Sequence, residues 1–72
     1  MHERLDNRLR DERTRRGLTQ AELAAMAEVS RKTINTVENG VFIPSTVLAL
    51  RLAHALDVTV ETLFQLPRPD PL

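Results

Sequence analysis

Two helix starts close together in the middle of the chain constrain the fold more than any other feature. The Thr19 hydroxyl and the Glu22 carboxylate have the spacing of a capping box, in which each satisfies an exposed backbone donor. Ser30 is the next N-cap, and only a few turn residues precede it. Small residues such as Ala24 and Ala27 line the first helix, so a second helix can approach it closely. The pattern predicts two short helices that are joined by a tight turn and cross at a steep angle.

Caps and helix breakers divide the rest of the sequence into three further segments. The five expected helices run from about Glu3 to Arg16, from Thr19 to the turn at residues 27–29, from Arg31 to about Asn39, from Ser45 to about Leu56, and from Thr59 to about Leu66. The fourth is apolar nearly all round, which predicts that it is the central helix. Prolines then end regular structure. We therefore expect an all-α, five-helix domain over residues 1–66 and a proline-rich tail over residues 67–72.

Composition excludes several ways of stabilising a chain of 72 residues. Cysteine is absent, which excludes disulfides and thiolate metal sites, and His2 and His54 have no metal-ligand spacing around them. We expect no cofactor and no metal, so tight helix packing and dimerisation remain as sources of stability. The net charge is zero, which by itself counts against nucleic-acid binding. No apolar run reaches the roughly 20 residues of a membrane span, and a cytoplasmic protein is expected.

The third segment has the chemistry of a DNA-reading helix. Ile34 and Val37 supply its buried face, so periodicity fixes the opposite face. The outward residues are Arg31, Lys32, Asn35 and Thr36. Arginine and lysine can donate to the major-groove acceptors of guanine, asparagine can bond adenine with both its groups, and threonine offers a methyl to thymine or a hydroxyl to a phosphate. A solvated helix face can have the same composition, but the tight turn and the caps favour recognition.

Two opposite charges are expected to pair between the first and third helices. Arg13 continues the apolar stripe of Leu5 and Leu9 by another step of four residues, and Glu38 lies four residues after Ile34. Both charges therefore lean toward the core from neighbouring helices. Since an isolated buried charge is costly, we predict a salt bridge between Arg13 and Glu38. Two separate surface charges are the alternative.

The chain resembles the Cro/phage-repressor (Xre-type) helix-turn-helix family in four stretches: G-L-T-Q-A-E-L-A at residues 17–24, V-S-R-K-T-I-N at 29–35, V-E-N-G at 37–40 and P-S at 44–45. The similarity covers roughly residues 4–66 and is closest to short stand-alone bacterial regulators. It implies a repressor-like DNA-binding domain in which Gln20 contacts a phosphate and braces the recognition helix. Thr33 and Asn39 would be further phosphate contacts, and the four outward residues of the third segment occupy base-reading positions. Arg13 and Glu38 match the family's inter-helix salt bridge.

The sequence departs from the pattern of that family in the turn at Glu28 and in the stretch at residues 41–43. Glu28 stands in the turn where the family usually has glycine, so a left-handed backbone there would cost about 1–2 kcal/mol. Val41, Phe42 and Ile43 follow Gly40, where the family often has a basic residue and polar neighbours, and an expected phosphate contact is lost. We expect Phe42 and Ile43 to cover the core beneath this loop; a protein-docking patch is the alternative.

These features together predict a sequence-specific regulator of transcription that acts as a repressor. One recognition helix reads only a few base pairs, so we expect a homodimer on a palindromic double-stranded operator. The expected interface is the fifth helix, with Val60, Leu63, Phe64 and Leu66, although some of these residues would equally close the monomer core. The alternative is an antitoxin-like or adaptor module that binds a protein partner. We expect no enzyme, because no nucleophile–base pair, carboxylate pair, phosphate-binding glycine loop or metal cluster is found.

Overall fold

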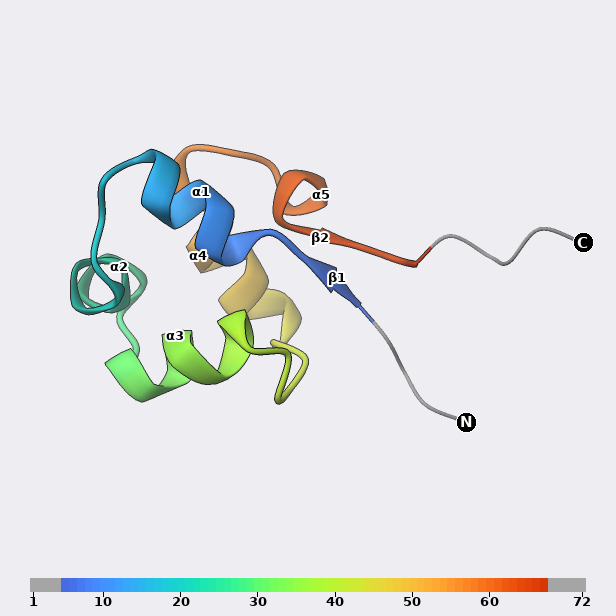
Figure 1. Cartoon of the computed structure of the whole chain (residues 1–72), viewed down its shortest axis with the longest axis horizontal. Coiled ribbons are helices and arrows are strands. Elements are labelled where there is room, and N and C mark those ends of the chain that lie inside the picture. Colours follow the sequence, from blue (N-terminus) through green and yellow to red (C-terminus); the bar gives the residue numbers. More distant parts are fainter. Residues whose placement is uncertain (1–4, 68–72) are drawn as a thin grey trace, which may run out of the picture.

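Five helices and a pair of short strands make up the computed structural model, which describes residues 5–67. The elements are β1 (Asp6–Asn7), α1 (Leu9–Arg15), α2 (Gln20–Ala27), α3 (Arg31–Glu38), α4 (Thr46–Leu56), α5 (Val60–Leu63) and β2 (Phe64–Gln65). β1 and β2 are antiparallel and leave the helical body together, on the side away from α2 (Figure 1). The five-helix architecture is confirmed, with this small sheet added. The expected helix start at residue 3 and the tail residues 68–72 lie outside the described residues.

Local capping chemistry explains where four of the helices begin. The side chains of Thr19, Ser30, Ser45 and Thr59 each accept a hydrogen bond from the backbone amide three residues ahead, which satisfies a donor that the helix leaves unpaired. At Thr19 the box is complete, because the Glu22 carboxylate accepts a hydrogen bond from the Thr19 amide at 2.8 Å. The predicted capping box and N-caps are therefore all present.

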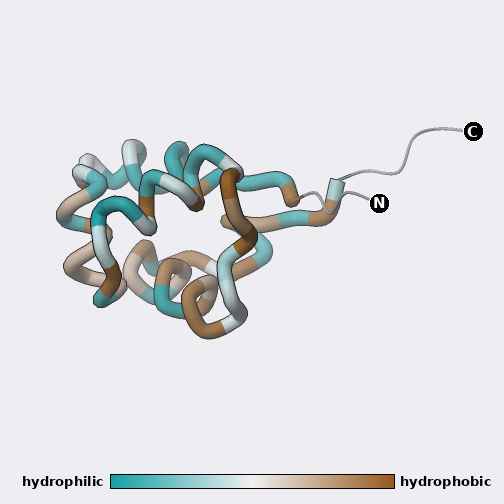
Figure 2. The backbone as a smooth tube through the Cα atoms, turned by 90° about the horizontal axis from the view of Figure 1, so that it is seen from below, coloured by the Kyte–Doolittle hydropathy of each residue, from teal (hydrophilic) through white to brown (hydrophobic). Residues whose placement is uncertain are grey.

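Apolar side chains from all five helices meet in one core. The fully buried members include Leu9, Leu23, Ile34, Leu52 and Leu63, one from each helix in turn. In Figure 2 hydrophilic stretches predominate along one edge of the molecule, and hydrophobic stretches are more frequent toward the opposite edge. Helices of 4 to 11 residues are too short to be stable alone, so this shared core holds them in place. Among the described residues, no helix is long and apolar enough to cross a bilayer.

The first helix begins later than the sequence pattern predicted. Residues 6–7 are extended, and α1 starts at Leu9. The cause is Asn7, whose side-chain oxygen accepts a hydrogen bond from the Leu9 amide at 2.9 Å and whose side-chain amide donates to the Val37 carbonyl of α3. Leu5 therefore precedes the helix instead of forming a stripe with Leu9, although it still packs against the core.

The last helix is shorter than predicted. α5 ends at Leu63, and the next two residues pair with β1, so that Phe64 lies opposite Asn7. The Arg8 amide also donates to the Leu63 carbonyl at 2.8 Å. Backbone pairing with a segment at the other end of the chain therefore replaces the expected continuation of the helix to Leu66.

One side of α4 and the loop before it remain open, which corrects two expectations. Leu52 is fully buried, but Val47 and Leu50 are 59% and 46% exposed, so α4 is not enclosed on all sides. Phe42 and Ile43 are 41% and 48% exposed and do not cover the core. Several large apolar side chains of this loop and of α4 are therefore left exposed on the single chain.

Candidate nucleic-acid interface

The turn between α2 and α3 depends on one left-handed residue. Glu28 follows α2 with φ 60° and ψ 42°, and the Val29 amide donates to the Ala24 carbonyl at 3.0 Å. Ala24 and Ala27 are 4% and 1% exposed, and their small side chains leave room for α3. Glycine adopts this backbone without strain, whereas another residue pays about 1–2 kcal/mol. The tight helix pair predicted from the caps is thus built, at a local cost in backbone strain.

α3 presents two distinct faces. Ile34 and Val37 have no exposed surface and anchor the helix in the core. Thr36 is half-buried, and its hydroxyl donates to the Thr33 carbonyl at 2.9 Å. The other three outward residues are exposed: Arg31, Lys32 and Asn35. Two cations and an amide therefore share one accessible face of a helix whose opposite face is fixed.

Gln20, the first residue of α2, connects three positions along α3. Its side-chain amide donates to the Asn35 side-chain oxygen at 3.2 Å and to the Glu38 carboxylate at 3.1 Å. Its side-chain oxygen accepts a hydrogen bond from Arg31 at 3.2 Å. These contacts are those of a brace, because they hold two exposed side chains of α3 in a defined arrangement before any ligand is bound.

The Glu38 carboxylate, at the end of α3, has no exposed side-chain surface. Arg13 donates to it twice, from Nε to Oε2 at 2.6 Å and from Nη2 to Oε1 at 3.1 Å, so the structure brings the two charges together in a bidentate pair. Burial raises the pKa of Glu38, but hydrogen bonds from Arg13 and Gln20 outweigh that effect and leave the pKa below its usual value. The hydrogen bond to Glu38 likewise raises the pKa of Arg13, and the pair is charged at neutral pH.

Thr33 and Asn39, which the resemblance places at the DNA backbone, lie at opposite ends of α3. Thr33 is half-buried in the first turn, with its hydroxyl 2.9 Å from that of Ser30. Asn39 is exposed directly after the last turn, and its side-chain oxygen accepts a hydrogen bond from Arg10 at 2.7 Å. Sequence reasoning did not single out Arg10. Its position three residues before Arg13, on the same side of α1, is the signal that would have found it.

The four residues expected at a dimer interface do not share one surface. Leu63 and Phe64 are 0% and 8% exposed, so both belong to the core of the single chain, although Phe64 also lines an open apolar groove. Val60 is half-buried, and Leu66 is 82% exposed. The physical reason is the shortness of α5, because a single turn has one apolar side and that side faces the core.

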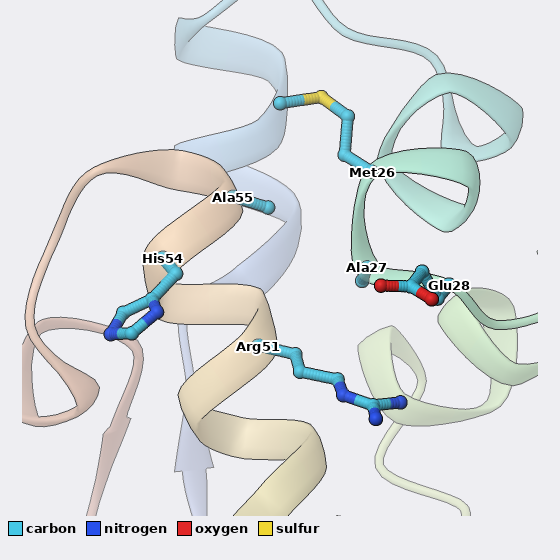
Figure 3. Close-up of a pocket in the computed structure, with 6 residues that line it drawn as sticks. All are labelled: Met26, Ala27, Glu28, Arg51, His54 and Ala55. Carbon is cyan, nitrogen blue, oxygen red and sulfur yellow. The ribbon is translucent and has the colours of Figure 1, made fainter.

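An open pocket of about 510 Å³ lies between α2 and α4, behind the turn (Figure 3). The side chains of Glu28 and Arg51 reach into the space between the two helices, and His54 points away from it. Among the described residues, no side-chain polar atom is both buried and without a partner. The polar groups of this pocket are ordinary surface groups, and we assign them no part in the interface.

Comparison with known proteins agrees with this geometry. The helix-turn-helix family profile matches residues 9–63. The uncharacterised HTH-type transcriptional regulator YgzD of Bacillus subtilis is 32% identical over 62 residues, which cover 86% of this chain and 94% of that protein. An uncharacterised HTH-type transcriptional regulator of Archaeoglobus fulgidus is 40% identical over 57 residues, which cover 79% of this chain and 81% of the relative.

Solved structures show the same likeness. The restriction-modification controller protein C.AhdI from Aeromonas hydrophila is 41% identical and superposes with a TM-score of 0.73, covering 75% of this chain and 82% of that one. The clp gene regulator ClgR from C. glutamicum is 33% identical with a TM-score of 0.71, covering 75% and 70% of the two chains. Together with the paired helices and the exposed face of α3, these matches show that the chain belongs to the helix-turn-helix family of DNA-binding transcriptional regulators.

Proposed function

We propose that this regulator binds a specific double-stranded DNA sequence by placing α3 in the major groove. The outward face of α3 carries the proposal, because Arg31, Lys32 and Asn35 are exposed together while Ile34 is fixed in the core. Arginine and lysine donate to the two acceptors of guanine, and asparagine pairs with adenine. Arg31 and Lys32 lie in the first turn of α3, the end that reaches base edges in helix-turn-helix proteins.

Residues around both ends of α3 are proposed to hold the DNA backbone. Gln20 opens α2, Thr33 lies in the first turn of α3, and Asn39 follows its last turn. Contacts with phosphates fix the register of a protein on the duplex without reading the sequence. Thr36 is proposed to contact a base through its methyl group, because its hydroxyl is already bonded within the helix.

A homodimer on a palindromic operator is the proposed binding form, and occupancy of a promoter is the proposed means of repression. A two-fold dimer presents two recognition helices to half-sites one helical turn apart. An open apolar groove of about 260 Å³, lined in part by Ile43, Leu50 and Val60, supports the binding of a second copy. Leu66 is the other exposed apolar residue from the interface expected on sequence grounds.

One observation favours a second candidate, an antitoxin-like or adaptor protein that binds a protein partner. Val41 and Phe42, in the loop after α3, are 71% and 41% exposed although both are apolar. Such side chains at the edge of a DNA-facing helix also suit contact with another protein. The zero net charge is compatible with that role. The two candidates differ in whether duplex DNA alone is bound selectively.

Selection of bound sites from random duplex DNA tests the proposal, with the wild type, Arg31→Ala and Thr33→Ala run in parallel. The wild type is expected to enrich a palindrome. Arg31→Ala is expected to lose about 1–3 kcal/mol of preference at one position in each half-site. Thr33→Ala is expected to weaken binding by the same factor on every sequence, as a phosphate contact should. Absence of any enriched sequence with the wild type would refute sequence reading and favour the protein partner.

A further inference from the structure

Two arginines of α1 converge on one carboxylate, which leaves a surplus positive charge. Glu38 is already matched by Arg13 through hydrogen bonds of 2.6 and 3.1 Å, and Gln20 donates to it as well. Arg10 adds a longer contact of 3.3 Å. Its side chain is 55% exposed, whereas that of Arg13 is 12% exposed. Since one carboxylate neutralises one guanidinium, the cluster keeps a net charge of about +1, and Arg10 carries it at the surface.

The guanidinium of Arg10 lies at the end of α3, beside two residues that are proposed to contact DNA. Its Nη2 donates to the Asn39 side-chain oxygen at 2.7 Å, and the Asn39 side-chain amide donates to Asn35 at 3.3 Å. A guanidinium has five N–H donors, and these contacts use only two of them. The remaining donors are available to an anion that approaches the exposed side chain.

The loop that follows α3 supplies no positive charge. The segment at residues 40–44 reads Gly-Val-Phe-Ile-Pro, without a single ionisable side chain. We propose that Arg10 is a further DNA-binding residue, which contacts a backbone phosphate next to the end of α3. This inference rests on the proposed binding of duplex DNA. It assigns the role to an arginine on α1, outside the helix pair that reads the sequence.

The contacts of Arg10 also explain why such a phosphate contact would be effective. The hydrogen bonds to Asn39 and Glu38 hold the guanidinium in place, so little side-chain freedom is lost when a phosphate binds. Because a backbone phosphate is the same at every base pair, the Arg10 contact contributes equally on every sequence.

The test is equilibrium binding to the selected duplex and to an unrelated duplex at 50 and 200 mM salt. Four proteins are compared: the wild type, Arg10→Ala, Arg10→Lys, and Arg15→Ala as a matched control on α1, whose partner Glu12 is on the same helix. Each phosphate contact contributes about 0.9 to the slope of log affinity against log salt, so a dimer loses about 1.8 in Arg10→Ala. The wild type then loses roughly ten-fold more affinity than Arg10→Ala between the two salt concentrations. Arg10→Lys and Arg15→Ala are expected to keep the wild-type slope.

An unchanged slope in Arg10→Ala, with urea unfolding showing a folded protein, would overturn the inference and leave Arg10 as a structural brace. A loss confined to the selected duplex would overturn it as well, because a backbone contact acts on both duplexes. A different outcome would refute the proposed sequence-specific binding without affecting the role of Arg10. If the wild type shows no sequence preference but Arg10→Ala still lowers the salt slope, sequence reading is refuted and the phosphate contact stands.

Discussion

Replacing Arg13 by alanine is the perturbation that most severely tests the structural account. The Glu38 carboxylate has no exposed side-chain surface, and Arg13 donates two hydrogen bonds to it, the shorter of 2.6 Å. The same guanidinium also donates to the Leu18 carbonyl at 2.8 Å. After the substitution only Gln20 and the longer contact from Arg10 remain. A buried charge would then be left with incomplete compensation.

The cost follows from the burial of the pair. Removing one partner of a buried ion pair costs about 3–5 kcal/mol, mostly because the remaining charge stays desolvated. We expect Arg13→Ala to lower the free energy of unfolding by about 3 kcal/mol, the lower end of that range, because Arg10 and Gln20 still contact Glu38. A chain of this size has a urea dependence of about 1 kcal/mol per M, so the unfolding midpoint should fall by about 3 M. Glu38→Gln should cost less, since the arginine it leaves is partly exposed.

Urea unfolding followed by circular dichroism, at neutral pH and near pH 3, measures this effect. The pKa of Glu38 is lowered on folding, so its ion pair stabilises the fold above the unfolded pKa of about 4.3 and that stabilisation is lost as the pH falls through the folded value. The difference in free energy of unfolding between the wild type and Arg13→Ala should therefore be smaller near pH 3 than at neutral pH. Arg15→Ala, which breaks an exposed pair on the same helix, should leave the midpoint unchanged. If Arg13→Ala lowers the free energy of unfolding by less than about 1 kcal/mol, or by the same amount at both pH values, the buried ion pair does not stabilise the fold as expected.

Three further substitutions give separate predictions. Glu28→Gly should raise the free energy of unfolding by about 1 kcal/mol, because it removes left-handed strain at a smaller entropic cost; Glu28→Ala should give no gain. Ser30→Ala should lower stability by about 1 kcal/mol in thermal melts through loss of the α3 cap, and an unchanged melting temperature would count against that cap. Leu50→Glu should reduce the dimer fraction in analytical ultracentrifugation, whereas Val47→Glu, on the same helix but outside the groove, should not. Equal effects of these last two changes would exclude the groove as the interface.

The parts of the fold that depend on nearby residues were predictable from the sequence. Caps at Thr19 and Ser30 arise from a side chain and an amide three residues apart, so a short motif determines them. Helical spacing placed Arg13 and Glu38 on inward edges, and the structure joins them at 2.6 Å. The outward face of α3 followed from the same spacing, because the burial of Ile34 fixes which side chains remain outside.

Features set by distant parts of the chain were not predictable. The pairing of residues 6–7 with residues 64–65 involves two residues on each side, too few for any periodic pattern. Asn7 ends the extended segment through contacts with both Leu9 and Val37, and the second partner is unknown before the fold is known. Phe42 was expected inside because it is apolar, but its burial depends on whether space remains over the core. Hydrophobicity alone does not give that information.

Changing the spacing of the selected site shows whether two copies of α3 read two half-sites. Wild-type affinity is measured for the selected palindrome and for the same duplex with five base pairs inserted at its centre, which places the half-sites on opposite sides of the helix. We expect the insertion to lower the affinity by about 100-fold or more at physiological salt, because only one recognition helix can then dock. Equal affinity for the two duplexes would contradict dimeric reading of the operator.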